Sequence, residues 1–321
     1  MELTYRDIKA ATDRVTGRVR PVALAPGDRP AGTASGELWF ALEFMQHTGT
    51  FKARGAQNFI QAHREEGTLP TAGVTIASGG NAGLACAWAA QQQGVTATVF
   101  LPTTAPAVKV DKLRGYGAQV RLVGDQYTDA LGACLEYAET SGALLSHAYD
   151  NPLIAAGAGT LMEEIHHQLP GLDTIVVAVG GGGLFAGIAT AADHYGIRTV
   201  AVEPENCCAL RAAIEAGQVV DGPADSVAAD SLGARRVTEL ALLAARHYDV
   251  ESLLVSDNEI IAARHALWHD RRLAVEHAAA TALAALTTDD QRPGRAYRPG
   301  PDERVCVVLC GANTDPTDLM R

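Results

Sequence analysis

The chain has 321 residues and a mass of 33.6 kDa, with a formal net charge of -11 at pH 7 and a pI near 5.3. This acidic balance argues against nucleic-acid binding, which requires a basic surface, and no apolar run is long enough to span a bilayer. The N-terminus lacks the pattern of a signal peptide, and the six cysteines form no Cys-x-x-Cys pair. We therefore expect a cytoplasmic, soluble protein with reduced thiols and no nucleic-acid or membrane partner.

Short apolar runs alternate with alanine-rich helical stretches along most of the chain. The expected strands cover residues 38–44, 74–77, 96–101, 119–123, 174–179, 199–203 and 304–310. The expected helices cover residues 82–93, 127–141, 159–168, 184–195 and 258–270, the last with Asp257 as its N-cap. Several strand runs are continuously apolar, which is typical of strands buried on both faces. The pattern predicts an α/β fold with mostly parallel sheets flanked by helices.

Lys52 stands out because the chain carries its positive charge almost entirely as arginine. Of 26 Lys and Arg residues only four are lysine, and arginine cannot lose its proton to act as a nucleophile. Lys52 lies between Gly49 and Gly55, where small residues would let the backbone approach a ligand closely. Taken alone, Lys52 could also be a solvated residue at the start of a helix.

Two glycine-rich loops each follow an apolar strand and precede a helix. Residues 180–183 are all glycine, and such a loop before a helix offers N–H groups and a positive helix end to a phosphate. The run lacks the spacing of a dinucleotide fingerprint and the lysine of a P-loop. The loop at residues 78–83 offers N–H groups and the Ser78 hydroxyl to a carboxylate. The alternatives are a tight turn without a ligand and a simple helix cap.

Cys310 ends the last expected strand and is followed by a glycine. Ligands bind at the carboxyl ends of parallel strands, so this side chain is a candidate for the same site. A buried structural cysteine is the alternative.

Together these motifs resemble the fold-type II pyridoxal-phosphate enzymes, whose fold is tryptophan-synthase-β-like, and among them the serine/threonine dehydratase family. The resemblance extends from about residue 38 to residue 313. It implies that Lys52 forms a Schiff base with pyridoxal 5'-phosphate, that Phe51 packs near the ring, and that Cys310 faces the pyridine nitrogen. The remaining implied contacts are Asn81 with the 3-hydroxyl, Gly180, Gly181, Gly182, Gly183 and Leu184 with the phosphate, and Ser78, Gly79, Asn81 and Ala82 with the substrate carboxylate.

Other stretches also match the family. They are Gly157-x-Gly159-Thr160-x-x-Glu163, Val202-Glu203-Pro204, residues 230–233 and Val275-Glu276. In the family the glutamate of Val-Glu-Pro often helps to hold a cation, so Glu203 is a candidate for a monovalent cation. An ordinary partly buried carboxylate is the alternative, and Ala209 stands where racemases carry an aspartate.

The resemblance implies a lyase that performs β-elimination on a hydroxyamino acid such as L-threonine or L-serine, giving a 2-oxo acid and ammonia. The amino acid would displace Lys52, and the freed amine would remove the Cα proton. Because Gly79 replaces the second serine of serine racemases, we expect little racemisation. The alternatives are β-replacement or a hydroxyaspartate-specific lyase of the same fold, a binding protein that has lost activity, and a dinucleotide-binding oxidoreductase.

We expect a small inserted domain at residues 48–147 and a large cofactor-binding domain built from residues 1–47 and 148–321. The cofactor would lie in the cleft between them. The family is commonly dimeric, so we expect a homodimer, and we expect no allosteric regulatory domain after the catalytic fold.

Overall fold

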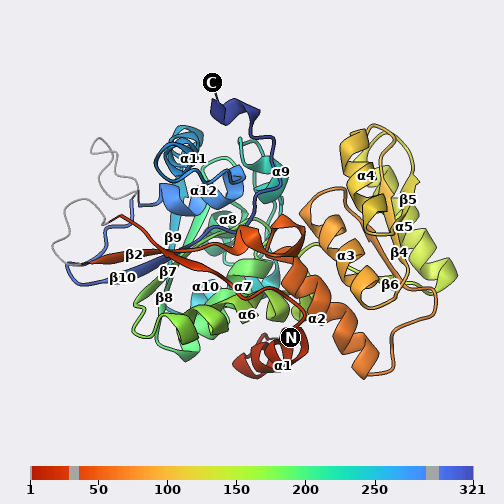
Figure 1. Ribbon diagram of the computed structural model, residues 1–321, viewed down its shortest axis with the longest axis horizontal. Helices are drawn as coiled ribbons and strands as arrows, with labels where there is room; N and C mark the ends of the chain where they lie inside the picture. Colours follow the sequence, from red (N-terminus) through yellow and green to blue (C-terminus); the bar gives the residue numbers. More distant parts are fainter. Residues whose placement is uncertain (1, 29–35, 287–295, 321) are drawn as a thin grey trace.

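The computed structural model describes residues 2–28, 36–286 and 296–320 (Figure 1). Its larger sheet has the strand order β1-β2-β10-β7-β8-β9. Strands β1 and β2 are antiparallel, and every other neighbouring pair in this sheet is parallel. The strands are β1 (Leu24–Pro26), β2 (Glu37–Ala41), β7 (Thr174–Ala178), β8 (Arg198–Pro204), β9 (Val250–Val255) and β10 (Arg304–Val308).

A second sheet has the order β5-β4-β3-β6, and all its pairs are parallel. Its strands are β3 (Val74–Ala77), β4 (Ala97–Leu101), β5 (Gln119–Leu122) and β6 (Leu144–Leu145). These strands come from one continuous part of the chain, whereas the larger sheet joins strands from both ends of it. The domain boundaries at residues 48 and 147 stay a prediction.

Helices cover the faces of both sheets (Figure 1). On the larger sheet, α7 and α10 pack on one side with α6 and α1 outside them, and α12 lies on the sheet beneath α11. On the smaller sheet, α3 and α5 both pack on the strands, and α2 packs on α3 and α6. The helices are α1 (Tyr5–Val15), α2 (Lys52–Glu65), α3 (Asn81–Gln92), α4 (Ala107–Gly115), α5 (Tyr127–Ser141), α6 (Pro152–Gln168), α7 (Gly183–His194), α8 (Ala209–Ala216), α9 (Ala229–Leu232), α10 (Glu239–His247), α11 (Asp257–Arg271) and α12 (His277–Ala284). Short 3-10 turns cover Glu43–Met45, His47–Gly49 and Thr317–Met320.

The expected α/β class is confirmed, and β3 and α5 have the expected bounds. The expected strand at residues 38–44 is shorter, because the chain leaves the sheet after Ala41 and turns at Glu43–Met45. The expected helix at residues 159–168 begins earlier, at Pro152, whose fixed φ suits the first turn. In the parts of the chain described, no helix has the length and apolarity that a bilayer crossing needs.

The prediction that Asp257 caps α11 is wrong. The N-cap is Ser256, whose hydroxyl accepts the Glu259 N–H while the Glu259 carboxylate accepts the Ser256 N–H at 2.6 Å. This reciprocal pair is a capping box. Asp257 instead accepts hydrogen bonds from the Ser226 hydroxyl at 2.5 Å and the Val227 N–H at 3.2 Å, and so holds the segment before α9.

Glycines allow the central helices to cross closely. A Cβ on Gly157 of α6 would lie 2.7 Å from the Arg54 carbonyl oxygen and from the Cα of Gly55 in α2. A Cβ on Gly159 would lie 2.7 Å from the Gly187 carbonyl oxygen in α7. The Gly157-x-Gly159 stretch therefore serves helix packing.

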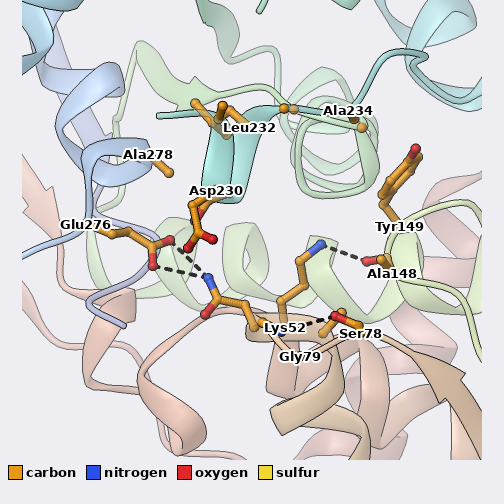
Figure 2. A pocket seen from close by; sticks show the side chains of 18 of the residues that line it. Lys52, Ser78, Gly79, Ala148, Tyr149, Asp230, Leu232, Ala234, Glu276 and Ala278 are labelled. Carbon is orange, nitrogen blue, oxygen red and sulfur yellow. Dashed lines mark hydrogen bonds between the residues drawn. The ribbon is translucent and has the colours of Figure 1, made fainter. Parts of the chain in front are cut away.

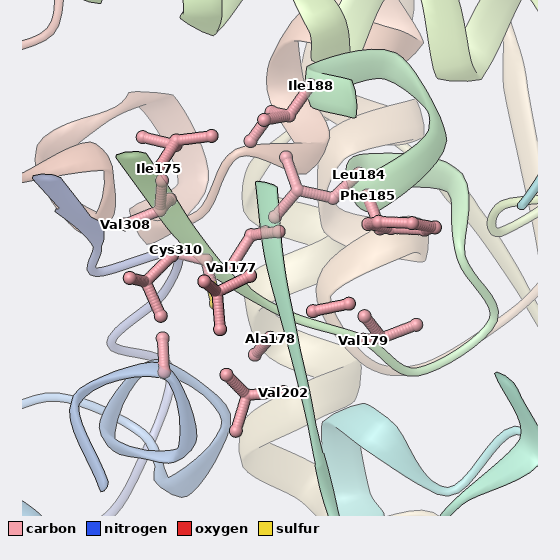
Figure 3. Close-up of a cluster of buried hydrophobic side chains, with 14 of the residues drawn as sticks. Ile175, Val177, Ala178, Val179, Leu184, Phe185, Ile188, Val202, Val308 and Cys310 are labelled. Atoms are coloured by element: carbon pink, nitrogen blue, oxygen red, sulfur yellow. The ribbon is translucent and has the colours of Figure 1, made fainter. Parts of the chain in front are cut away.

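A cluster of buried apolar side chains lies beneath the start of α7 (Figure 3). Its side chains come from β7, α7, β8 and β10, and include Val177, Leu184, Val202 and Val308, all buried. Burial of each such side chain contributes roughly 1.5–3 kcal/mol relative to an exposed one. This cluster fixes the strand ends from which the candidate site is built.

Candidate active site

A cavity of about 660 Å³ lies at the carboxyl ends of strands from both sheets. Its walls include Ala178 and Cys310 from the larger sheet and Leu101 from the smaller one. The cavity brings together every cofactor and substrate residue expected from the sequence: Phe51, Lys52, Ser78, Gly79, Asn81, Ala82, Gly180, Gly181, Gly182, Gly183, Leu184 and Cys310. Glu203 lies elsewhere.

Lys52 is the first residue of α2, and its side chain projects into the cavity (Figure 2). Its Nζ donates a hydrogen bond to the Ala148 carbonyl oxygen at 2.7 Å and lies 4.8 Å from the centre of the Phe51 ring. Burial lowers the pKa of Lys52 to about 8, against the opposing influence of Cys310 and Glu276. A substantial fraction of this amine is neutral near pH 8, as a nucleophile or base requires.

A buried ion network holds α2 just beyond Lys52. Arg54 is fully buried, and its guanidinium contacts two carboxylates. Its Nε lies 2.7 Å from Glu43 Oε1, and its Nη1 lies 2.7 Å from Glu164 Oε1. The Nη2 atom contacts the second oxygen of each partner, at 3.0 Å and 2.9 Å, so both pairs are bidentate. This network fixes the start of α2 relative to α6.

The glycine run forms the turn from β7 into α7. Gly182 has φ +91, a conformation that side chains rarely adopt. A Cβ on Gly181 would lie 2.3 Å from the Tyr149 ring, and one on Gly183 would lie 2.9 Å from the Tyr149 carbonyl oxygen. The loop therefore has no room for side chains. Its backbone and the positive end of a 12-residue helix face the cavity, which suits a phosphate.

Cys310 follows β10 at another wall of the cavity and is buried. Its carbonyl oxygen accepts the Phe51 N–H at 3.0 Å, which joins the end of β10 to the residue before Lys52. Burial, and then the nearby Glu276 carboxylate, raise the pKa of the Cys310 thiol strongly. The thiol is therefore neutral at physiological pH.

Asn81 is the first residue of α3, and its side chain forms hydrogen bonds with Glu276, just before α12, and with Asn313, just after β10. Its Nδ2 lies 3.2 Å and 3.1 Å from the two carboxylate oxygens of Glu276, contacts that Figure 2 marks with dashed lines. Its Oδ1 accepts a hydrogen bond from Asn313 Nδ2 at 2.8 Å. Burial raises the pKa of Glu276, and the hydrogen bond from Asn81 opposes that shift.

The loop before α3 presents Ser78 and Gly79 to the cavity (Figure 2). The Ser78 Oγ accepts the Gly80 N–H at 3.4 Å. A Cβ on Gly79 would lie 2.6 Å from Leu101 Cδ2, so a side chain there would have to displace Leu101.

Glu203 is buried outside the cavity, at the N-terminus of α8. Its Oε1 accepts the Leu210 N–H at 2.7 Å and its Oε2 accepts the Arg211 N–H at 2.9 Å. Burial raises its pKa to about 7. Both oxygens thus satisfy a helix end, and the described residues contain no cluster of three or more His, Cys, Asp or Glu side chains suited to a metal. A cation at Glu203 stays a prediction.

Four further residues at the site had no predicted role, although Asp230 falls in the stretch 230–233 that matches the family. Ala148 contributes a backbone oxygen to the amine and Tyr149 packs against the glycine loop, and neither contact is visible in a local sequence pattern. Lys109 on α4 and Asp230 on α9 line the cavity and form an ion pair at 3.4 Å between the two sheets' helices. Asn313 could have been found, because it follows the Cys310 strand end.

Comparisons with known proteins agree with this geometry. Residues 15–311 match the family model described as "Pyridoxal-phosphate dependent enzyme". The chain is 36% identical over 315 residues to an L-threonine ammonia-lyase of Geobacter sulfurreducens, covering 98% of this chain and 76% of that one. It is 35% identical over 284 residues to a human serine dehydratase-like protein, covering 86% and 85%. The solved structure of maize serine racemase superposes with a TM-score of 0.90 at 28% identity, covering 100% of this chain and 96% of that one.

The residues present fit pyridoxal phosphate. The cavity has a single amine with a lowered pKa, a loop that excludes side chains at a helix start, and a neutral thiol, each on a different wall. Such an arrangement can attach an aldehyde and bind a phosphate.

Proposed function

The chain belongs to the pyridoxal-phosphate dependent enzymes, and from that membership we propose that it eliminates water from a hydroxyamino acid such as L-threonine or L-serine, after which hydrolysis takes up one water and releases ammonia. The products are a 2-oxo acid and ammonia. The observation that carries the proposal is that Lys52 and the glycine loop line one cavity, next to the neutral thiol of Cys310. The names of the relatives, an L-threonine ammonia-lyase and a serine dehydratase-like protein, support the same reaction.

When bound, pyridoxal phosphate stabilises negative charge at the Cα of an amino acid. In our proposal Lys52 would hold the cofactor, and its neutral amine would accept the Cα proton, since its pKa of about 8 suits a base near neutral pH. The backbone of residues 180–184 would hold the phosphate. Cys310 would present an uncharged group to the pyridine nitrogen, which would favour elimination over transamination.

The substrate carboxylate lies, in this proposal, on the loop of Ser78, Gly79, Asn81 and Ala82. Residues 48–147 form the small domain that carries this loop, and the cofactor lies between it and the large domain. We further propose that the protein works as a homodimer, as the family resemblance implies, and that it is cytoplasmic. Six free cysteines among the described residues suit a reducing compartment.

A hydroxyaspartate-specific activity is less well supported by the cavity. A second substrate carboxylate would be bound most strongly by charge-assisted hydrogen bonds from a cation. The cationic side chains lining the cavity are Lys52, which the cofactor uses, and Lys109, which pairs with Asp230 at 3.4 Å. A neutral side chain on the substrate fits this charge distribution better.

The test is an assay of the cofactor-loaded protein with L-threonine, L-serine and L-threo-3-hydroxyaspartate. We expect release of 2-oxo acid and ammonia in equal amounts from the first two. The variant Lys52→Ala should lose the cofactor's visible absorption and turnover, whereas Lys9→Ala, at a surface lysine, should keep both.

Three results would contradict the proposal: turnover by Lys52→Ala, consumption of an added thiol in place of ammonia release, and substantial D-serine formed from L-serine. The last would conflict with Gly79, which has no proton to donate on the opposite face of the substrate.

A further inference from the structure

The orientation of the Asn81 side chain is set by a chain of hydrogen bonds that begins at a backbone carbonyl. Asn313 Nδ2 lies 2.7 Å from the Thr48 carbonyl oxygen, which can only accept, so this atom must be the amide nitrogen. The same Nδ2 lies 2.8 Å from Asn81, whose facing atom must therefore be its oxygen. The Asn81 nitrogen then faces Glu276.

Glu276 completes this arrangement from the other side. Its two oxygens lie at nearly equal distances from Asn81 Nδ2, 3.2 Å and 3.1 Å, so one N–H points between them. The Glu276 backbone N–H donates to the Gly311 carbonyl oxygen at 3.1 Å, and a Cβ on Gly311 would lie 2.3 Å from Glu276 Oε1. The absence of a side chain at Gly311 thus makes room for this buried carboxylate beside the end of β10.

The bonding capacity of Asn81 can now be counted. An amide side chain has an oxygen that accepts and two N–H groups that donate. The oxygen receives Asn313, and one N–H is directed at Glu276. One N–H remains for the cavity that Asn81 lines. A flipped amide would place its oxygen against a carboxylate and its nitrogen against another N–H group, which is unfavourable at both ends.

We propose that Glu276 and Asn313 are positioning residues that hold Asn81 as a hydrogen-bond donor toward the 3-oxygen of bound pyridoxal phosphate. This inference rests on the proposed role of Asn81 at that oxygen. A donor stabilises the deprotonated, negatively charged form of the oxygen more than the protonated form. The protein therefore selects the form of the cofactor that absorbs visible light over the form that absorbs in the near ultraviolet.

The test measures the ratio of visible to near-ultraviolet absorbance in cofactor-loaded protein, together with the Kd for pyridoxal phosphate from titration of cofactor-free protein. In Glu276→Gln one acceptor oxygen becomes an NH2 group, so a single uncharged oxygen must serve both the Asn81 side chain and the Asn313 backbone N–H. We expect the ratio to fall roughly tenfold, because loss of a hydrogen bond to a charged group changes an equilibrium constant by about this factor or more. Asn313→Ser should lower the ratio in the same direction, acting from the other end of Asn81.

Two matched variants separate positioning from charge. Glu276→Asp keeps the charge but is one methylene too short to reach Asn81, so it should behave like Glu276→Gln. Glu65→Gln removes a carboxylate outside the cavity, whose partner is Arg14, and it should keep the wild-type ratio. Thermal unfolding of each cofactor-free variant serves as the control for folding.

The inference is overturned if Glu276→Asp keeps the wild-type ratio, or if Glu65→Gln lowers it as far as Glu276→Gln does. It is also overturned if Asn313→Ser leaves the ratio unchanged. Absence of any cofactor absorption from the wild-type protein would instead overturn the proposed function.

Discussion

Lys52 Nζ donates a hydrogen bond to the carbonyl oxygen of Ala148, and the residue that follows, Tyr149, stands against the glycine loop. A single short segment therefore contacts both the amine and the phosphate cradle. The distance between these two ends of the site is fixed through this segment as well as through the sheets.

Replacement of the buried amine should stabilise the cofactor-free protein. The pKa of Lys52 is lowered from 10.5 to about 8, so between these pH values the unfolded chain binds more protons at this group. Stability from this group therefore rises with pH from about 8 to 10.5, and below pH 8 the folded protein bears the full cost of the buried charge. Lys52→Met should raise the free energy of unfolding at pH 7 by about 2 kcal/mol, after allowance for the lost hydrogen bond.

Urea unfolding at pH 7 and pH 10 measures this effect, and the gain should shrink at the higher pH. Lys9→Met, at a largely exposed lysine, should change stability at pH 7 by less than about 0.5 kcal/mol. If Lys52→Met instead destabilises the protein at pH 7, burial of the charged amine does not lower the stability of the fold, and the prediction is wrong.

The Gly181→Ala variant should bind the cofactor weakly. Its Cβ would lie 2.3 Å from the Tyr149 ring, so either the ring or the loop must move. Overpacking of this kind costs about 1–3 kcal/mol, which corresponds to a rise in Kd for pyridoxal phosphate of roughly 5- to 150-fold. The double variant Gly181→Ala/Tyr149→Ala should recover part of the affinity. Equal affinities for the single variant and the wild type would exclude the steric explanation.

Arg54→Met should destabilise the fold. It would leave Glu43 and Glu164 without their shared cation, and loss of one partner from a buried ion network costs about 3–5 kcal/mol. The matched variant is Arg14→Met, which breaks the Arg14–Glu65 pair nearer the surface and should cost less than about 1 kcal/mol. Thermal and denaturant unfolding would reveal the difference, and similar losses in both variants would contradict it.

Gly157→Ala and Gly132→Ala should change stability in opposite directions. A Cβ on Gly157 meets the backbone of α2 at 2.7 Å, so helix crossing is disturbed and about 1–3 kcal/mol is lost. A Cβ on Gly132, on the exposed side of α5, meets no atom within 4 Å and should add about 0.5–1 kcal/mol. Urea unfolding of both variants is the measurement. A stabilised Gly157→Ala protein would refute the close crossing of α2 and α6.

The sequence predicted the parts of this structure that depend on local pattern. The apolar run of β3 and the long polar-apolar repeat of α5 gave correct bounds, because period and composition change at their ends. Helix α6 was expected to start too late, since Gly157 and Gly159 weaken helix propensity. These two glycines are needed because α6 packs closely against α2 and α7. Contacts between distant helices leave no local pattern in the sequence.

The residues of the candidate site also fall into a predictable group and an unpredictable one. Lys52, the glycine run and Asn81 carry chemistry that marks them in the sequence. Ala148 contributes only a backbone oxygen, and Tyr149 contributes the bulk that keeps residues 181 and 183 glycine. Glu276 matches the family, but its role could not be predicted because it lies 195 residues from Asn81 in the sequence. Such contacts depend on tertiary structure alone.

The position of β10 between β2 and β7 has a consequence for how the protein is made. During translation β7 emerges on the order of ten seconds before β10, and until then β2 and β7 each present an open strand edge. The four strands of the smaller sheet, in contrast, all lie within residues 74–145, so they can associate before β7 to β10 have been synthesised. Two strand edges of the larger sheet therefore stay unpaired until β10 has been synthesised, and the part of the cavity wall that Cys310 forms is complete only then.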